Sequence, residues 1–283
     1  DKAEKKALLR HIADLWLDKF TNPNKAIEPL EQILELDPAD ADALARLKEI
    51  YERRRNWRGL LGLYERELDL LPEDQRRPQL VAMADLAQKR LGDPKAAIAA
   101  WNRLLAIDPH DPEALEALIS LYERERRYPA LAEMLERQLA MSTDAEAVGL
   151  LERLGIIWGD RIDSPGRAIE IWRRVLEIQP GHTKAMRVLR DLYATAGDWR
   201  SLEALFEEQG NWPDFVETLH GAADRASDPE VQVQLYFKIA DTWITRLQRP
   251  ERAVKAYEKV LQVAPDNLEA ARSLVPIYES AQK

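Results

Sequence analysis

Residues 163–180 read DSPGRAIEIWRRVLEIQP, and residues 93–109 read DPKAAIAAWNRLLAIDP. In both segments a small residue is followed by a tryptophan and then by a closing proline. The residue numbers of the two tryptophans, Trp101 and Trp172, differ by 71, and so do those of the alanines before them and of the prolines after them. The pattern also occurs near both ends of the chain. A fixed period is the sequence signature of a repeat architecture, so we predict a chain built of repeated units.

Each unit is predicted to be a helical hairpin of about 34 residues. In the first unit, apolar residues between Leu9 and Trp16 recur at the three- and four-residue spacing of an amphipathic helix. Asn22 and Pro23 then indicate the start of a second helix, because asparagine caps a helix and proline fits its first position. Pro38 indicates the end of that helix.

Two kinds of hairpin alternate, because the even units lack the proline-capped junction between their helices. The full pattern therefore repeats only after two hairpins, which is every 71 residues. The odd units carry one extra residue before the second helix. We expect a single solenoid over residues 1–283. Its units are predicted at about residues 5–40, 41–74, 75–111, 112–145, 146–182, 183–227, 228–266 and 267–283, the last of them incomplete.

The register of the repeat breaks once. The residue numbers of Pro180 and Pro265 differ by 85, which is 14 more than the period, and the surplus lies within residues 198–227. Trp199 has the expected spacing to the helix before it, and Trp212 has the expected spacing to the helix after it. We interpret this as an extra helix made by local duplication. The hypothesis is that the insertion opens a pocket or bends the solenoid and forms a partner-specific or inter-domain contact.

Composition indicates an all-α fold, because glycine is scarce and no segment alternates apolar and polar residues like a strand. The formal net charge of −9 argues against nucleic acid or an anionic membrane surface as the main partner. The chain has no cysteine, which excludes disulfides and thiolate metal sites. No apolar run approaches the roughly 18–20 residues of a membrane span. We expect a soluble protein, with the cytoplasm favoured over the periplasm.

The sequence carries no sign of catalysis. The four histidines are His11, His110, His182 and His220, and none has the spacing of a metal ligand or of a nucleophile's partner. A glycine-rich phosphate loop and a GxSxG elbow are also absent. We therefore predict no catalytic residue, no metal site and no cofactor. The histidines are assigned structural or surface roles.

The eight tryptophans are predicted to be core residues rather than an aromatic cage. Those at positions 16, 101, 158, 172 and 243 recur at helical spacing in the repeat. Trp57, Trp199 and Trp212 stand at the starts of second helices and are assigned to the core as well.

The spacing of these residues resembles the tetratricopeptide repeat family, whose unit is a helix-turn-helix of about 34 residues. The matching residues are Leu151, Leu154, Gly155, Trp158, Ala168, Trp172 and Pro180 in the fifth unit, and Tyr236, Ile239, Ala240, Trp243, Ala253, Tyr257 and Pro265 in the seventh. The resemblance implies a right-handed α-solenoid. Its concave wall would be lined by the first helix of each hairpin and would hold a peptide or protein, so the protein is expected to be a non-enzymatic interaction scaffold.

Carrying the family's groove positions over to this chain gives a mostly acidic wall. The predicted partner-binding residues are Arg10, Asp14, Glu49, Glu52, Asp85, Gln88, Glu116, Ser120, Glu123, Glu152, Arg187, Asp191, Phe237 and Asp241. Four aspartates replace the asparagine with which the family's chaperone-tail binders clamp a terminal carboxylate, which argues against such a clamp.

An acidic wall favours a partner with a basic segment, because opposite charges steer association and select partners. For any single aspartate the alternative is a solvated residue paired with Lys or Arg one turn away. Two other functions remain open: a regulatory or substrate-recruiting segment of a larger enzyme or bacterial assembly protein, and self-association through the incomplete last unit.

The end of the chain departs from the repeat. Pro276 interrupts an otherwise helical pattern, which predicts a kink or an early end of the last helix. Because the chain begins at Asp1 and its last unit lacks a second helix, we expect it to be part of a longer protein.

Overall fold

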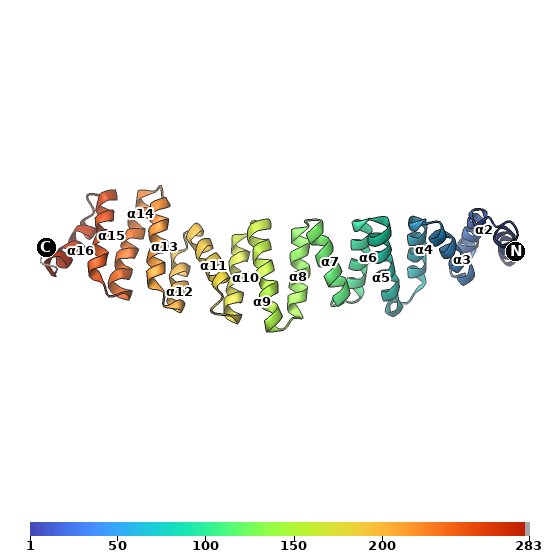
Figure 1. Ribbon diagram of the computed structural model, residues 1–283, viewed down its shortest axis with the longest axis horizontal. Helices are drawn as coiled ribbons and strands as arrows, with labels where there is room; N and C mark the ends of the chain where they lie inside the picture. The colour runs from blue at the N-terminus through green and yellow to red at the C-terminus, as the bar shows by residue number, and fades with distance from the viewer. Residues whose placement is uncertain (281–283) are drawn as a thin grey trace. The chain divides into compact units, whose positions relative to one another are not determined.

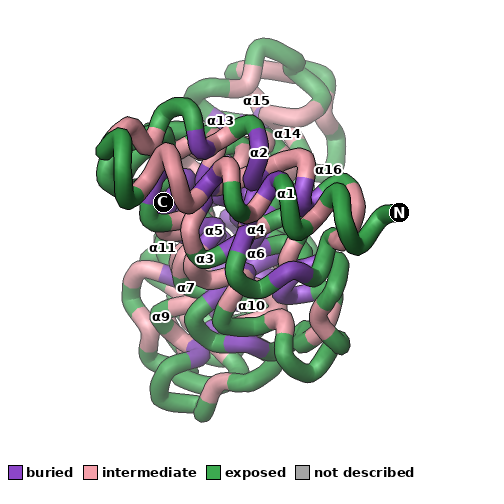
Figure 2. The backbone as a smooth tube through the Cα atoms, turned by 90° about the vertical axis from the view of Figure 1, so that its right-hand side faces the viewer, coloured by how far each residue is buried: buried purple, intermediate pink, exposed green. Residues whose placement is uncertain are grey.

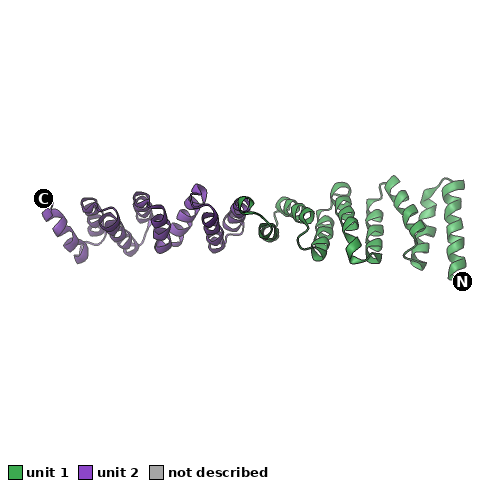
Figure 3. Ribbon diagram, turned by 90° about the horizontal axis from the view of Figure 1, so that it is seen from below, with its two compact units in different colours: residues 1–146 green, residues 147–283 purple. Residues whose placement is uncertain are grey.

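The chain is built of α-helices that follow one another closely along the sequence (Figure 1). The computed structural model describes residues 1–280, and this part of the chain contains no strand. The helices form two compact units, residues 1–146 and residues 147–283 (Figure 3). The predicted all-α solenoid class is thereby confirmed, while the boundaries predicted for the individual repeats stay predictions.

The first compact unit contains eight α-helices that begin within residues 1–140. They are α1 (Lys2–Asp14), α2 (Pro23–Leu36), α3 (Ala41–Arg53), α4 (Trp57–Leu70), α5 (Arg76–Leu86), α6 (Pro94–Ile107), α7 (Pro112–Arg124) and α8 (Tyr128–Ala140). Within this unit, each helix from α1 to α7 packs against the helix that follows it, so that pairs such as α1 with α2 and α5 with α6 form hairpins.

The second compact unit is described as far as residue 280. Its helices are α9 (Asp144–Ile156), α10 (Pro165–Ile178), α11 (Thr183–Ala196), α12 (Trp199–Gln209), α13 (Trp212–Arg225), α14 (Pro229–Asp241), α15 (Pro250–Val263) and α16 (Leu268–Ser280). The boundary between the two units falls in the first turn of α9. Figure 2 shows that buried positions recur along the helices of both units.

The extra residue of the odd units is accommodated in a π-helical turn. Such turns follow the first helix at Leu15–Lys19, Ala87–Leu91, Ile157–Arg161 and Thr242–Arg246. A π-helical turn is the usual result of one additional residue in a helix, because the hydrogen bond then spans five residues instead of four. At Leu15–Lys19 the Phe20 N–H donates to the Leu15 carbonyl at 2.9 Å. The second helix can therefore begin at its proline in the same register in each odd unit.

A small residue on the first helix lets the second helix of the hairpin approach closely. Ala13, Ala84 and Ala240 are fully buried at this position, and Gly155 occupies it in α9. A side chain at Gly155 would have its Cβ 2.5 Å from Nε1 of Trp172, whose own exposed fraction is 1 %. Within this hairpin, the glycine and the indole are therefore in direct contact.

The insertion adds one helix to the alternation of first and second helices. Three consecutive helices, α11, α12 and α13, stand where the pattern requires two, and α13 packs closely against α14. The guanidinium of Arg246 lies 4.7 Å from the ring centre of Trp212, just as that of Arg90 lies 5.4 Å from Trp57. Trp212 is therefore related to α14 as Trp57 is related to α5, which agrees with the spacing seen in the sequence.

Two sequence expectations need correction. All eight tryptophans were expected in the core, but only Trp101 and Trp172 are buried. The other six are half-buried, namely Trp16, Trp57, Trp158, Trp199, Trp212 and Trp243. Trp16 and Trp57 pack against the buried core while a Lys or Arg group lies over each ring, so these rings are only partly in the core. The chain also continues as α16 through Pro276 to Ser280, so an early end at that proline is wrong.

We predict that Gly155→Val destabilises the protein much more than Gly149→Val does. Both glycines lie in α9, but a Cβ at Gly149 would meet nothing within 4 Å. The change at Gly155 drives the side chain into Trp172 and should lower the free energy of unfolding by about 1–3 kcal/mol or more, as overpacking does. Urea denaturation of both variants measures the difference. Equal stability of the two would contradict the close approach of α9 and α10.

Candidate functional site

The candidate site is the surface that the first helices of the hairpins carry within each compact unit, and in both units we name it the first-helix wall. It comprises α1, α3, α5 and α7 in residues 1–146, and α9, α11 and α14 in residues 147–280. All fourteen predicted partner-binding residues lie on these helices or, for Gln88, on the π-helical turn after α5. Their side chains differ in what they contact, and this decides which of them are available to a partner.

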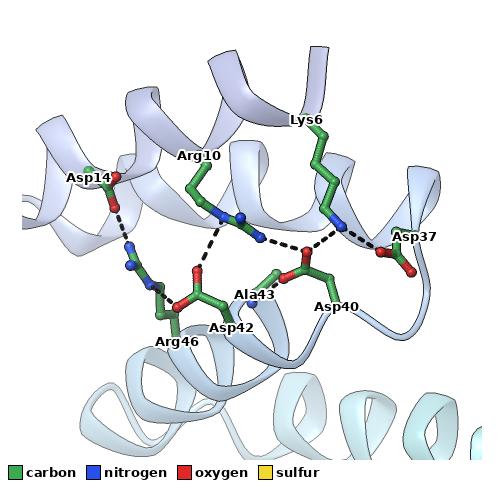
Figure 4. Close-up of polar contacts among 8 residues, drawn as sticks. All are labelled: Lys6, Arg10, Asp14, Asp37, Asp40, Asp42, Ala43 and Arg46. Atoms are coloured by element: carbon green, nitrogen blue, oxygen red, sulfur yellow. Dashed lines mark hydrogen bonds and ion pairs between the residues drawn. The ribbon is translucent and has the colours of Figure 1, made fainter. Parts of the chain in front are cut away.

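The first junction between neighbouring first helices is held by a network of charged side chains, shown in Figure 4. Asp40 caps α3 by accepting a hydrogen bond from the Ala43 N–H at 2.9 Å. The same carboxylate accepts a hydrogen bond from Arg10 of α1 at 2.7 Å and lies 2.6 Å from the Lys6 ammonium. Asp42 lies 3.4 Å from Nε of Arg10. A helix cap and an interhelical ion pair thus share one buried carboxylate.

The second junction repeats this arrangement one period later. Asp111 caps α7 by accepting from the Ala114 N–H at 2.9 Å, and its exposed fraction is 2 %. Arg77 of α5 donates to Asp111 at 2.7 Å and to Glu113 at 2.8 Å. Asp111 and Glu113 occupy the positions one period after Asp40 and Asp42.

The third junction keeps the geometry, but the acid and the basic groups exchange places. His182 caps α11 at the next equivalent position, because its Nδ1 accepts from the Ala185 N–H at 3.2 Å. Its Nε2 lies 2.9 Å from Glu152 of α9, and the Lys184 ammonium lies 2.5 Å from the same carboxylate. Glu152 occupies the position two periods after Arg10. The acid is now on the preceding helix and the basic groups are at the cap.

The pKa values of the capping aspartates reflect this network. Burial alone would raise the pKa of Asp111, but the hydrogen bonds from Arg77 and from the Ala114 N–H outweigh it and lower the pKa below its usual value. The pKa of Asp40 is lowered in the same way by Lys6 and the Ala43 N–H. A lowered pKa in the folded state means that this stabilisation is present above the unfolded pKa of about 3.9 and is lost as the pH falls below it.

Several acids of the predicted wall are therefore engaged within the protein. Asp14 forms an ion pair with Arg46 of the next first helix. Within single helices, Glu49 pairs with Arg53 at 2.5 Å and Asp85 with Lys89 at 2.9 Å. Asp191 pairs with the adjacent Arg190 at 2.9 Å, and Glu152 belongs to the third junction. The wall offers less free negative charge than its composition suggests.

Other predicted wall residues face solvent. Glu52, Glu116 and Asp241 are exposed, and none of them forms a side-chain ion pair within residues 1–280. The remaining exposed positions are Gln88, Ser120, Glu123 and Arg187. Phe237 differs from them, because its ring packs edge-on against Tyr257 at 5.9 Å and contacts the second helix of its own hairpin.

Two predicted residues from successive first helices meet at one cleft in residues 1–146. Glu52 of α3 and Asp85 of α5 line a cleft of about 380 Å³ together with the rings of Trp57 and Tyr64. Lys89 and Arg90 line it as well. Burial raises the pKa of Tyr64, and the nearby carboxylates of Glu52 and Glu67 raise it further. The cleft thus places carboxylates next to aromatic rings.

A larger cleft of about 1040 Å³ lies beside the insertion in residues 147–280. It is lined by α11, the start of α12, α13 and α14, and it contains Asp191 from the predicted wall. The sequence analysis did not single out Thr218, Gly221 or Ala222, which line the cleft on α13. The repeated tryptophan motif was the available signal, because it marked the insertion itself.

The described part of the chain, residues 1–280, holds no group of three His, Asp or Glu side chains placed to bind a metal ion. Within the same residues, no helix combines the length and the apolar character needed to cross a membrane.

Comparisons with known proteins identify the repeats. Three family models, each described as tetratricopeptide repeat, match this chain at residues 43–78 and 114–149, at residues 77–121, and at residues 233–267. Together these matches cover about half of the chain. No curated protein matches the sequence.

Several solved structures are similar to this chain. The crystal structure of MamA is 19 % identical, covers 62 % of this chain and 95 % of its own, and has a TM-score of 0.33. A tetratricopeptide repeat protein from Parabacteroides merdae is 18 % identical, with 96 % and 98 % covered and a TM-score of 0.33. In the structure of Naa15/Naa10 bound to HypK-THB, the matched chain is 16 % identical with a TM-score of 0.44. The match covers 98 % of our chain but only 39 % of the matched chain.

We predict that the charges of the third junction can be exchanged as a set but not singly. Glu152→Arg alone places a third basic group against His182 and Lys184 and should lower the free energy of unfolding by about 1 kcal/mol. The triple variant E152R/H182D/K184D copies the first junction and should recover most of that loss. Denaturant unfolding of the single and triple variants measures this coupling. A triple variant less stable than E152R would show that the sign of the charges matters beyond their pairing.

Proposed function

Because the chain belongs to the tetratricopeptide repeat family, we propose that it is a non-enzymatic scaffold that holds a basic segment of a protein partner on its first-helix wall. Proteins of this family are typically interaction modules, which supports protein binding in general. The basic character of the segment and its place on the wall are our own inference. They rest on the cleft that Glu52 and Asp85 share.

The shared cleft supports this proposal because its two carboxylates come from successive first helices. A segment lying across α3 and α5 can contact both of them. The rings of Trp57 and Tyr64 line the cleft as well, but each already lies under a cation of this chain, Arg90 at 5.4 Å and Lys48 at 5.3 Å from the ring centres. The two carboxylates, rather than the rings, therefore suit a lysine or arginine side chain of a partner.

The lysine that already pairs with Asp85 in this cleft can be replaced by a basic group of a partner. Asp85 and Lys89 form an exposed pair one turn apart on α5 and the π-helical turn after it, and such pairs contribute only about 0.3–0.5 kcal/mol. Glu52 forms no ion pair within the described residues. A partner's basic group can displace Lys89 at little cost, and within the same compact unit Glu116 on α7 is a further exposed acid of the wall.

We predict that peptides selected for binding will be rich in Lys and Arg and will depend on this cleft. Panning a displayed random peptide library on the whole chain supplies the ligands, and fluorescence anisotropy measures their affinity. The variant E52Q/D85N should bind them about five- to tenfold more weakly and with a smaller dependence on salt, because two carboxylates are lost.

The matched control is Glu65→Gln, which removes an exposed carboxylate from the second helix α4. This variant should bind like the original chain. Selection of acidic or purely apolar peptides, or equal binding by E52Q/D85N, would refute the proposed role of the wall.

Self-association is the alternative that a separate observation favours. Leu268 and Val275 on α16 have exposed fractions of 69 % and 53 %, which leaves large apolar side chains in water. If α16 mediates self-association, sedimentation velocity should show a concentration-dependent dimer that Val275→Lys abolishes. A chain that stays monomeric at all concentrations removes this alternative. A regulatory or recruiting role within a larger enzyme stays a prediction that the full-length sequence would test.

A further inference from the structure

The tryptophans of this chain are almost all covered by a cation. A Lys or Arg group lies 4.5–5.5 Å from the ring centre of six of the eight. These pairs are Trp16 with Lys25, Trp57 with Arg90, Trp158 with Arg167, Trp172 with Lys184, Trp212 with Arg246 and Trp243 with Arg252. Trp101 has no such partner but is buried, with an exposed fraction of 3 %. Trp199 alone is half-buried without a cation or a second ring against it in residues 1–280.

The uncovered ring has two covered counterparts elsewhere in the chain. Trp57, Trp199 and Trp212 each begin a second helix, and Trp199 occupies the position two periods after Trp57. Arg90 covers Trp57 and Arg246 covers Trp212, and both arginines lie in the π-helical turn that follows the next first helix. Within the repeat, the next first helix therefore supplies the arginine.

The insertion explains why Trp199 lacks this arginine. The first helix that should follow α12 is α14, but α13 now stands between them in the sequence. The arginine of the turn after α14, Arg246, lies over Trp212 at the start of α13. Trp199 is left lining the cleft of about 1040 Å³ beside the insertion.

Two positions of this cleft carry smaller residues than the equivalent positions of the repeat. Two periods earlier, Ala194 and Gly197 correspond to Glu52 and Arg55, so a carboxylate and a guanidinium are replaced by a methyl group and a hydrogen. Both small residues line the cleft together with Trp199. A Cβ at Gly197 would come 4.0 Å from Nε1 of Trp199, so the glycine leaves this edge of the indole accessible.

We propose that this cleft binds an arginine side chain of a protein partner, which stacks on Trp199 in the place that the chain's own arginines take on Trp57 and Trp212. Arginine is favoured over lysine because both internal counterparts are guanidinium groups, which are planar and weakly hydrated and therefore stack well on aromatic rings. The site lies on residues other than the cleft of Glu52 and Asp85, so the inference goes beyond the proposed function.

The charges around the cleft are compatible with an incoming guanidinium. Asp191, Asp214 and Glu217 line it, and Glu217 is exposed and forms no ion pair within the described residues. The two cations of the lining are held by other groups of the cleft itself. Arg190 pairs with Asp191 at 2.9 Å, and Arg225 donates to the Gly221 carbonyl at 2.9 Å.

The test uses the whole chain labelled with 5-fluorotryptophan and observed by fluorine NMR. The variants W199F and W57F assign two of the eight resonances, and thermal melting confirms that each variant folds. The probe is N-acetyl-arginine amide, and N-acetyl-citrulline amide is the neutral control of the same shape. We expect a saturable shift of the Trp199 resonance with the arginine probe, at least about threefold larger than with citrulline, and no comparable shift of the Trp57 resonance.

The peptides selected on the whole chain give a second readout. Those that shift the Trp199 resonance should contain arginine and should bind W199A about tenfold more weakly, which corresponds to about 1.4 kcal/mol. The double variant E52Q/D85N should keep the shift of the Trp199 resonance. The experiment therefore tests the Trp199 cleft separately from the cleft of Glu52 and Asp85. Equal shifts with arginine and citrulline, equal shifts at Trp57 and Trp199, or no shift at Trp199 would each overturn the proposal.

Discussion

The structure depends on the close approach of the two helices within the odd-numbered hairpins. A fully buried Ala13, Ala84 or Ala240, or Gly155 in α9, keeps the first helix thin enough for the second helix to lie against its backbone. The cost of violating this constraint is highest where Trp172 meets Gly155, because a rigid indole fills the space that any side chain would need. The same contact recurs after each period. It is set by the repeated small and large residues, by the π-helical turns and by the prolines that begin the second helices. A hairpin cannot bury its apolar face alone, so repetition is itself a condition of stability.

The junctions between first helices keep their pairing even where the acid and its basic partner exchange places. Asp40 and Asp111 cap their helices and receive basic groups, whereas His182 caps its helix and receives Glu152. Each junction thus satisfies a helix end and links two helices with the same few side chains. For function, this means that part of the charge on the first-helix wall is structural. The net charge of −9 does not translate into an equally acidic binding surface.

The insertion gives the chain a place unlike any other along its length. In an unbroken repeat each second helix meets the same neighbour, and the arginine of the next π-helical turn covers the leading aromatic ring. Because α13 is inserted, the arginine of the next π-helical turn covers Trp212, and Trp199 lines an open cleft. A local duplication can therefore create a binding site without a new kind of residue, because it removes an internal partner from an existing one.

The order of the amino acids alone was enough to predict the helices, their alternation, the small and large positions of the core and the place of the insertion. These features follow from local rules: apolar spacing, capping residues and prolines act within one or two turns of a helix. Tertiary packing sets which charges are free and which rings are covered. Arg46 reaches Asp14 from the next first helix, and Arg246 covers Trp212 from the turn after the following helix. Such pairings depend on distances of a few ångströms between different helices, and periodicity along a single helix does not specify them.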